Sequence, residues 1–271
     1  MTTDSPSSSN VYATGGTRER IENGLAEAGL NLDELTADQL SPIEHFHVSG
    51  PLATMALIDP LNIKAEDRVL DAGTGIGGTA RYVANKFGAH VTAVDLTAEY
   101  VAAAQWLNEL VGLDELIDVS EADVTDLPFE DGSFDLVVSQ HVQMNIADKA
   151  KLYAETARVL APGGRLAIWD VVAGSVEPLL FPVPWANNPE ESHLAGVDEL
   201  REILEAAGFE VDVWNDQTKS NAEFMRALLA APPSPLGLHL FVPNVTEKIV
   251  SVVESLEQDR ARLIQAVLVK R

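Results

Sequence analysis

Residues 69–78, VLDAGTGIGG, combine an apolar run, one carboxylate and a cluster of glycines. Gly73, Gly75 and Gly78 match the G-x-G-x-x-G pattern of dinucleotide-binding loops, in which the missing Cβ atoms let the backbone approach a ligand. The start of the following helix would add N–H donors and partial positive charge. Asp71, however, stands just before the glycines, where its carboxylate would repel a pyrophosphate. It favours a cationic group, such as an amino-acid ammonium or a sulfonium, over NAD; a tight turn without a ligand is the alternative.

A second acid, Asp95, ends the next apolar run, 20 residues after Gly75. A carboxylate at this distance accepts hydrogen bonds from the ribose hydroxyls of an adenosine. Taken alone, Asp95 is equally consistent with an ordinary acid at a strand end. Together, the two acids predict a site for an adenosine that carries a cationic group.

The elements that must position these residues alternate regularly. Apolar runs at 67–72, 90–96, 117–123, 133–140 and 164–172 are typical of strands, and helical patterns occupy 78–87, 98–112 and 148–160. This alternation predicts right-handed crossovers and a parallel sheet with helices on both faces. Beyond Gly174 four prolines indicate an irregular loop, which we expect near the active site. A helix and a strand then follow over 197–216, two helical pieces over 220–258, and a final strand at the C-terminus.

Composition excludes several classes of protein. The chain has 271 residues with 46% hydrophobic side chains, enough for one elaborated domain with a sizeable core. A net charge of −24 without a basic stripe argues against nucleic acid and anionic membranes as partners, and the simplest role for the acidity is solubility. The absence of cysteine excludes disulfides, thiolate zinc sites and cysteine nucleophiles. No stretch is apolar over the roughly 20 residues that a membrane-spanning helix needs, so we expect a cytoplasmic protein.

The motifs taken together resemble those of class I S-adenosylmethionine-dependent methyltransferases. VLDAGTGIGG, VTAVDLT, EADVTDLPFEDGSFDLVVSQ and RVLAPGGRLAIWD occur in that family's order and at its spacing. The upstream segment EHFHVSGPLAT resembles the subgroup that methylates small metabolites, such as the sarcosine and dimethylglycine methyltransferases and their quinol- and tocopherol-methylating relatives. The resemblance covers about residue 45 to the end. SQHVQMNI stands where other subgroups carry an N-P-P-[YF] motif, which favours a small molecule over a DNA base or a protein amide.

The resemblance implies S-adenosylmethionine as cofactor and a set of residues that hold it. Asp71 and Gly73 would meet the methionine part, with Thr74 and Gly75 on the same wall. The remaining cofactor positions would be Asp95 on the ribose, Leu96 on the adenine face, Asp123 and the Val124 N–H on the adenine edge, and Gln140 at the methyl-donor pocket.

The acceptor side is less defined by sequence. His141, one residue past the strand at 133–140, is the candidate general base, because its reference pKa near 6.5 suits proton transfer; a purely pocket-shaping role is the equal alternative. Gln143 and Asn145 could orient a polar substrate or cap the following helix. His47 is expected to reach the active site, and the i, i+2 spacing of His45 and His47 argues against a metal site.

Trp185 lies in the proline-rich loop. The simpler interpretation places Trp185 on the surface. The functional interpretation makes it part of a lid that binds the substrate.

The resulting prediction is a Rossmann-like, doubly wound sheet of seven strands, mostly parallel with the last strand antiparallel. Residues 1–20 would be a flexible tail, and 21–271 a single methyltransferase domain with cap insertions at about 174–197 and 219–258. We expect methyl transfer from S-adenosylmethionine to a small-molecule acceptor, with a sugar- or phenol-type hydroxyl favoured. N-methylation of a glycine derivative and C-methylation of a quinol are alternatives, and a non-catalytic cofactor-binding protein is the rival outside the class. The sequence does not decide whether the protein forms a homodimer.

Overall fold

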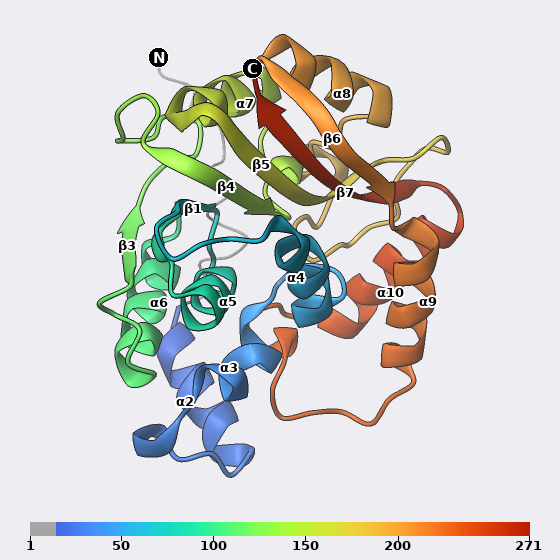
Figure 1. Cartoon of the computed structure of the whole chain (residues 1–271). Coiled ribbons are helices and arrows are strands. Elements are labelled where there is room, and N and C mark those ends of the chain that lie inside the picture. Colours follow the sequence, from blue (N-terminus) through green and yellow to red (C-terminus); the bar gives the residue numbers. More distant parts are fainter. Residues whose placement is uncertain (1–14) are drawn as a thin grey trace, which may run out of the picture.

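The computed structural model describes residues 15–271. Its sheet contains seven strands in the order β3-β2-β1-β4-β5-β7-β6, drawn in the upper half of Figure 1. The strands are β1 (Arg68–Ala72), β2 (His90–Asp95), β3 (Ile117–Glu121), β4 (Phe134–Gln140), β5 (Leu160–Ala173), β6 (Phe209–Asp216) and β7 (Ala261–Lys270). The first five are mutually parallel, whereas β7 runs antiparallel to both β5 and β6. The predicted mixed sheet with an antiparallel last strand is confirmed.

Helices cover both faces of this sheet because its central strands are apolar on both sides. The helices that pack on it include α4 (Gly50–Ile58), α5 (Gly78–Phe87), α6 (Ala98–Leu110), α7 (Lys149–Val159) and α8 (Val197–Ala206). Neighbouring residues of β1, Val69 and Leu70, are both buried but belong to different core clusters, one with α4 and α5 and the other with α7 and α8. Figure 1 shows the two helical layers on opposite sides of the strands.

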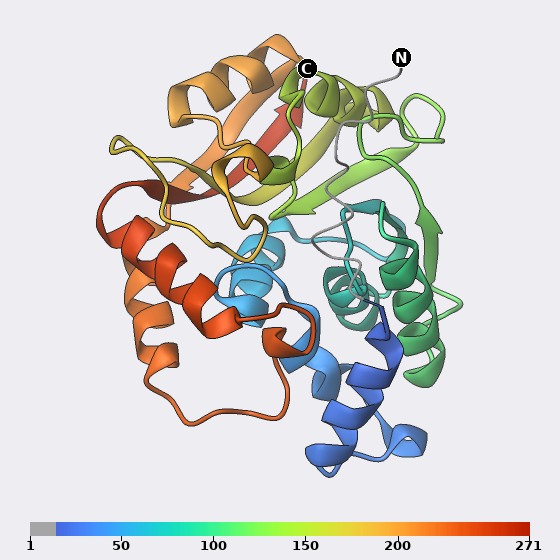
Figure 2. The ribbon, with the colours of Figure 1, turned by 180° about the vertical axis from the view of Figure 1, so that it is seen from behind.

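A third cluster of buried apolar residues joins the beginning and the end of the chain. It contains residues from α2 (Thr17–Glu27), α3 (Ala37–Glu44), α6 and the 3₁₀ turn η5 (Leu238–Leu240). The Arg20 side chain crosses this junction and donates a 2.6 Å hydrogen bond to the Leu240 carbonyl. Figures 1 and 2 show that these segments, with α9 (Thr218–Leu229) and α10 (Val245–Glu257), form a helical cap on one side of the sheet.

Helix α2 begins at Thr17, inside the segment predicted as a flexible tail; residues 1–14 of that segment lie outside the described residues. The Glu99 carboxylate accepts the backbone N–H groups of Gly15 and Thr17, at 3.1 and 2.5 Å. Glu99 is on α6, more than 80 residues away. The local sequence does not contain a helix start signal that so distant a residue supplies. This explains why α2 begins earlier than the predicted end of the tail.

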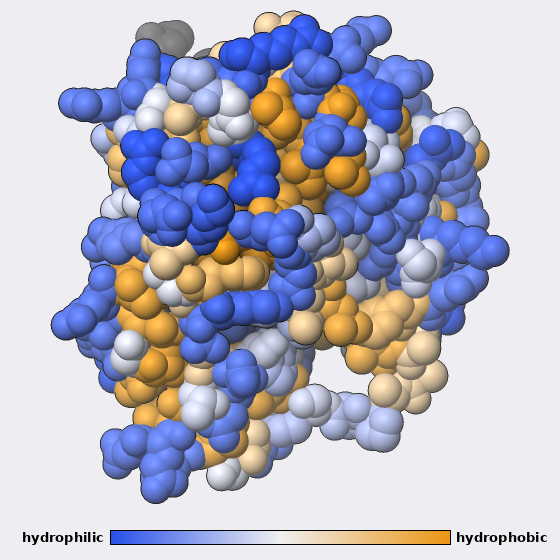
Figure 3. Space-filling view, viewed as in Figure 1, coloured by the Kyte–Doolittle hydropathy of each residue, from blue (hydrophilic) through white to orange (hydrophobic). Residues whose placement is uncertain are grey.

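The proline-rich segment after β5 has no long helix or strand, as predicted; its one helical turn is η4 (Pro189–Glu191). It is nevertheless packed into the molecule, because Val183, Trp185 and Ala186 are at most 3% exposed. No helix within residues 15–271 is long and apolar enough to span a bilayer. Figure 3 shows mostly hydrophilic residues on one face, with apolar patches between them, in keeping with the acidic composition.

Candidate active site

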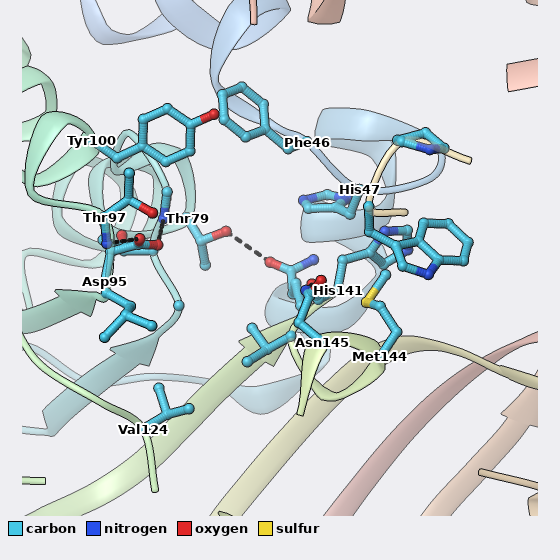
Figure 4. A pocket seen from close by; sticks show the side chains of 18 of the residues that line it. Phe46, His47, Thr79, Asp95, Thr97, Tyr100, Val124, His141, Met144 and Asn145 are labelled. Atoms are coloured by element: carbon cyan, nitrogen blue, oxygen red, sulfur yellow. Dashed lines mark hydrogen bonds between the residues drawn. The ribbon is translucent and has the colours of Figure 1, made fainter. Parts of the chain in front are cut away.

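A pocket opens at the carboxyl ends of β1, β2 and β4, beneath the cap. Ligands of open α/β sheets bind at this edge, where the strand order reverses around the first strand. Figure 4 shows Asp95 and Val124 at one end of the pocket and His47, His141, Met144 and Asn145 at the other. The two ends correspond to the predicted cofactor side and the predicted acceptor side.

The glycine loop forms one wall of the pocket. Gly73 and Gly75 have φ values of +83° and +56°, and the Gly73 and Thr74 N–H groups each donate 2.9 Å hydrogen bonds to the Val94 carbonyl of β2. A Cβ on Gly73 would collide with Val142. A Cβ on Gly78 would lie 2.5 Å from the Glu44 carbonyl oxygen. Two of the pattern's glycines are therefore required by close packing, whereas Gly75 faces the pocket beside Phe46.

Asp71 lies at the base of this loop and is only 3% exposed. Its Oδ2 accepts hydrogen bonds from the Thr74 hydroxyl at 2.6 Å and the Ala80 N–H at 3.1 Å. Burial raises the pKa of Asp71 from 3.8 to about 6, and hydrogen bonds from these two neutral donors oppose the shift. A buried carboxylate whose hydrogen-bond donors are neutral is suited to a cationic ligand group at the pocket wall.

Asp95 is held in place by backbone groups from both sides. Its Oδ2 accepts the Gly75 N–H at 2.8 Å and its Oδ1 accepts the Thr97 N–H at 2.9 Å. The carboxylate therefore bridges the glycine loop and the start of α6, and burial raises its pKa. Its oxygens keep further lone pairs for the two hydroxyls of a ribose.

Leu96, Asp123 and Val124 line the pocket beside Asp95. Leu96 is 42% exposed and Val124 is buried, so they can offer apolar contact to a flat ring. The Asp123 Oδ1 accepts the Thr125 N–H at 2.8 Å, which fixes the side chain at the pocket edge. The structure thus brings together all of the residues predicted for the nucleoside.

Gln140, the last residue of β4, lines the bottom of the pocket. Its Oε1 accepts hydrogen bonds from the Thr79 hydroxyl at 2.7 Å and the Thr54 hydroxyl at 3.3 Å. Its Nε2 is buried and has no hydrogen-bond partner among residues 15–271, which leaves two N–H donors for a ligand. Thr54 and Thr79 were not predicted from sequence; Thr54, a lone hydroxyl in the apolar helix GPLATMALI, was the available signal.

His47 lies at the acceptor end, as expected. Its Nε2 is 3.0 Å from the Thr54 hydroxyl oxygen, and its Nδ1 is buried without a partner in the described part of the chain. Burial lowers the pKa of His47 from 6.5 to about 4. The ring is therefore neutral at physiological pH. His45, beside it in sequence, also contacts Thr54 but does not line the pocket.

His141 lines the pocket from the loop after β4, with its ring centroid 6.0 Å from that of His47. The expectation of an ordinary histidine pKa is wrong, because burial lowers the pKa of His141 well below 6.5. Its Nε2 accepts the Val48 N–H at 3.3 Å, so the proton of the neutral ring is on Nδ1. The predicted base thus has its lone pair in a hydrogen bond.

The remaining predicted acceptor residues divide into two groups. Asn145 and Trp185 line the pocket, and Trp185 is 3% exposed, so its ordinary interpretation as a surface residue is wrong. Gln143 is completely buried outside the pocket, where its Nε2 donates a 2.6 Å hydrogen bond to the Val171 carbonyl. Neither Gln143 nor Asn145 caps the following helix, because the Asp148 side chain caps α7.

Further apolar side chains line the pocket and were not predicted from the sequence: Phe46, Val48, Met144, Met225, Val242, Ile249 and Val252. They come from the segment between α3 and α4, from η3 (Gln143–Asn145), and from the cap around α9 and α10. No local pattern distinguishes them from core residues.

The residues present fit S-adenosylmethionine. The pocket offers a buried carboxylate, a second carboxylate clamped by backbone N–H groups, an unpartnered amide nitrogen and a glycine cradle. Within residues 15–271 no group of three or more His, Asp or Glu side chains is arranged to hold a metal ion.

Comparison with known proteins finds similarity to methyltransferases. Residues 70–168 match the family model described as a methyltransferase domain. A sarcosine/dimethylglycine N-methyltransferase from Halorhodospira halochloris is 33% identical over 55% of this chain and 54% of that protein. The chloroplastic tocopherol O-methyltransferase of Arabidopsis thaliana is 44% identical over 37% of this chain and 29% of that protein. The matched regions span about half or less of these relatives.

A solved structure, a sarcosine dimethylglycine methyltransferase described as putative, from Galdieria sulphuraria, shares the fold. Its TM-score is 0.70 at 20% identity, with 84% of this chain and 94% of that chain covered.

Fold and pocket together define a Rossmann-like domain with a ligand pocket at the switch point of its sheet. Residues 70–168 of this domain match the methyltransferase model, and the residues of the pocket fit S-adenosylmethionine as methyl donor.

Proposed function

We propose that this chain transfers a methyl group from S-adenosylmethionine to a hydroxyl oxygen of a small-molecule acceptor. The observation that carries the proposal is the pocket itself: carboxylates and a free amide line one end, and two neutral imidazoles line the other. The bound cofactor would supply an electrophilic methyl group on a sulfonium, with Asp71, Asp95 and Gln140 holding its ammonium, ribose and carboxylate respectively.

The protein's own contribution is alignment and removal of one proton. An in-line transfer needs the acceptor oxygen close to the methyl carbon, and a mostly apolar pocket beside the cofactor end restricts the acceptor to such positions. A hydroxyl must lose its proton as the oxygen–carbon bond forms, whereas an unprotonated amine needs no base.

We assign the base role to His47 in preference to His141. The Thr54 hydroxyl donates to the Gln140 Oε1, so its oxygen accepts from the His47 Nε2–H. This hydrogen-bond chain leaves the lone pair of His47 on Nδ1, the buried atom without a partner. His141, whose Nε2 already accepts the Val48 N–H, would instead offer its Nδ1–H as a donor to the acceptor.

N-methylation of a small amine is the second candidate, and the activity named for the Halorhodospira relative favours it. C-methylation of a quinol and cofactor binding without catalysis complete the alternatives.

The test is transfer of a labelled methyl group from S-adenosylmethionine to the members of a metabolite library, followed by His47→Asn on the best acceptor. We expect kcat to fall by about 10²–10⁴-fold with the cofactor Kd unchanged, because general-base catalysis is worth that much. His45→Asn is the matched control outside the pocket, and His141→Asn should lose less than His47→Asn. A wild-type kcat in the His47 variant would favour amine methylation, and cofactor binding without any transfer would favour the non-catalytic alternative.

A further inference from the structure

Within the part of the chain that the structure describes, the acceptor end of the pocket has no positively charged side chain. No lysine or arginine lines the pocket among residues 15–271, and residues 1–14 contain neither residue type in their sequence. Arg81, the arginine nearest in sequence to the glycine loop, is completely buried outside the pocket and pairs with Glu44 at 2.7 Å. His47 and His141 do not replace a cation, because burial lowers the pKa of both rings.

Among residues 15–271, a free negative charge is missing at the acceptor end too. The carboxylates that line the pocket are Glu44, which is paired with Arg81, and Asp71, Asp95 and Asp123, which belong to the cofactor end. An acceptor that entered with a carboxylate, a phosphate or an ammonium group would lose hydration without gaining a partner. Burial of an unpaired charge is strongly unfavourable.

What the acceptor end does offer is apolar area with a few hydrogen-bonding groups. Met144, Trp185, Met225 and Val252 line it, and the polar groups beside them are the two imidazoles and the Asn145 amide. Sites of this kind bind apolar molecules and orient them through a few polar contacts.

We infer that the acceptor is an uncharged, predominantly apolar molecule with a hydroxyl group, such as a phenol or an alicyclic alcohol. Amino acids of the glycine type and phosphorylated amines are excluded by the same argument. This inference rests on the proposed function, because it specifies the acceptor of the same pocket. It differs from what the names of the glycine and phosphoethanolamine methyltransferases among the relatives would suggest, and it agrees with the name of the tocopherol O-methyltransferase.

The experiment uses three probes of matched shape: 2-naphthol, 2-naphthoate and 2-naphthylmethylammonium. Their Kd values are measured by calorimetry at pH 7.5 on the full chain saturated with S-adenosylhomocysteine, with sarcosine and phosphoethanolamine as additional ligands. We expect 2-naphthol to bind at least tenfold more tightly than either charged probe. A charged ligand that binds as tightly as 2-naphthol, or no binding of 2-naphthol, would overturn the inference.

A gain-of-charge variant tests the same point from the protein side. Met225→Lys, which places an ammonium in the apolar wall, should improve binding of 2-naphthoate at least tenfold, and Met225→Gln is the uncharged control. If the Met225→Lys variant still binds S-adenosylhomocysteine but keeps the wild-type ratio of the Kd values for 2-naphthol and 2-naphthoate, the inference is contradicted. Failure of the wild-type chain to bind S-adenosylhomocysteine at all would instead count against the proposed function, so the two failures are distinguishable.

Discussion

At the scale of single residues, the chemistry of this site depends on burial more than on residue type. Asp71 and His47 are both titratable and both line the pocket, and burial moves their pKa values in opposite directions, to about 6 and about 4. In each case the low-dielectric surroundings disfavour the charged form. Asp71 therefore changes charge near the pH at which many enzymes are assayed, whereas His47 stays neutral.

This property of Asp71 predicts a pH-dependent cofactor affinity. Below pH 6 the carboxyl of the free protein is protonated and cannot pair with an ammonium; above pH 6 it is ionised, and the bound cation lowers its pKa further. The Kd for S-adenosylmethionine should thus rise about tenfold from pH 7 to pH 5, as expected for one linked proton. Calorimetry across this range measures it. The Asp71→Asn variant should bind S-adenosylmethionine weakly, with a Kd that does not change with pH. A Kd that does not change with pH in the wild-type chain would contradict the pairing of Asp71 with the ammonium group.

At the scale of elements, one buried ion pair connects three helices around the glycine loop. Arg81 on α5 pairs with Glu44 at the end of α3, and its Nη1 donates a 2.8 Å hydrogen bond to the Asn108 Oδ1 on α6. Its Nη2 also donates to the carbonyl of Ile76 in the loop. The guanidinium thus fixes the loop against the first helices of the cap, where Gly78 and the Glu44 carbonyl are in close contact.

Removal of this guanidinium should be costly because it leaves Glu44 buried and unpaired. We expect Arg81→Met to lower the free energy of unfolding by about 3–5 kcal/mol, the range measured for broken buried pairs. The double variant Arg81→Met with Glu44→Gln should recover part of this loss, since the orphaned charge is gone. Urea denaturation of the wild type, both single variants and the double variant gives the coupling energy. Strictly additive effects would show that the pair does not act as a unit.

At the scale of the whole molecule, the pocket lies between parts of the chain that are far apart in sequence. Phe46 follows α3, Met225 lies on α9 and Val252 lies on α10, and all three line the same cavity as the sheet edge. A ligand in this cavity would contact both the Rossmann-like core and the cap, and would link their stabilities.

S-adenosylmethionine should therefore raise the melting temperature of the entire chain in one transition. At 100 times its Kd the cofactor adds about 2.7 kcal/mol to the native state. For a chain of this length that corresponds to a shift of about 5–10 °C. Differential scanning fluorimetry measures the shift, and Asp95→Ala should reduce it. Two separate transitions, with only one moved by the cofactor, would show that core and cap unfold independently.

The sequence by itself determined the sheet and the cofactor end of the pocket. Asp71, Asp95 and Gln140 each stand at or near the end of an apolar run, and parallel neighbouring strands necessarily bring their carboxyl ends to one edge. The alternation of short apolar runs with helical patterns is local information, so the mostly parallel sheet and the position of these residues could be predicted with little knowledge of packing.

Only the tertiary structure decided the acceptor end. Trp185 is buried and Gln143 points away from the pocket, contrary to one interpretation of each, because long-range packing rather than the local pattern sets their exposure. The lone pair on the His141 Nε2 accepts the Val48 N–H, 93 residues away, whereas the His47 Nδ1 has no hydrogen-bond partner among residues 15–271. The protonation and orientation of a buried side chain depend on neighbours that only folding brings together, and those neighbours are what the sequence does not contain.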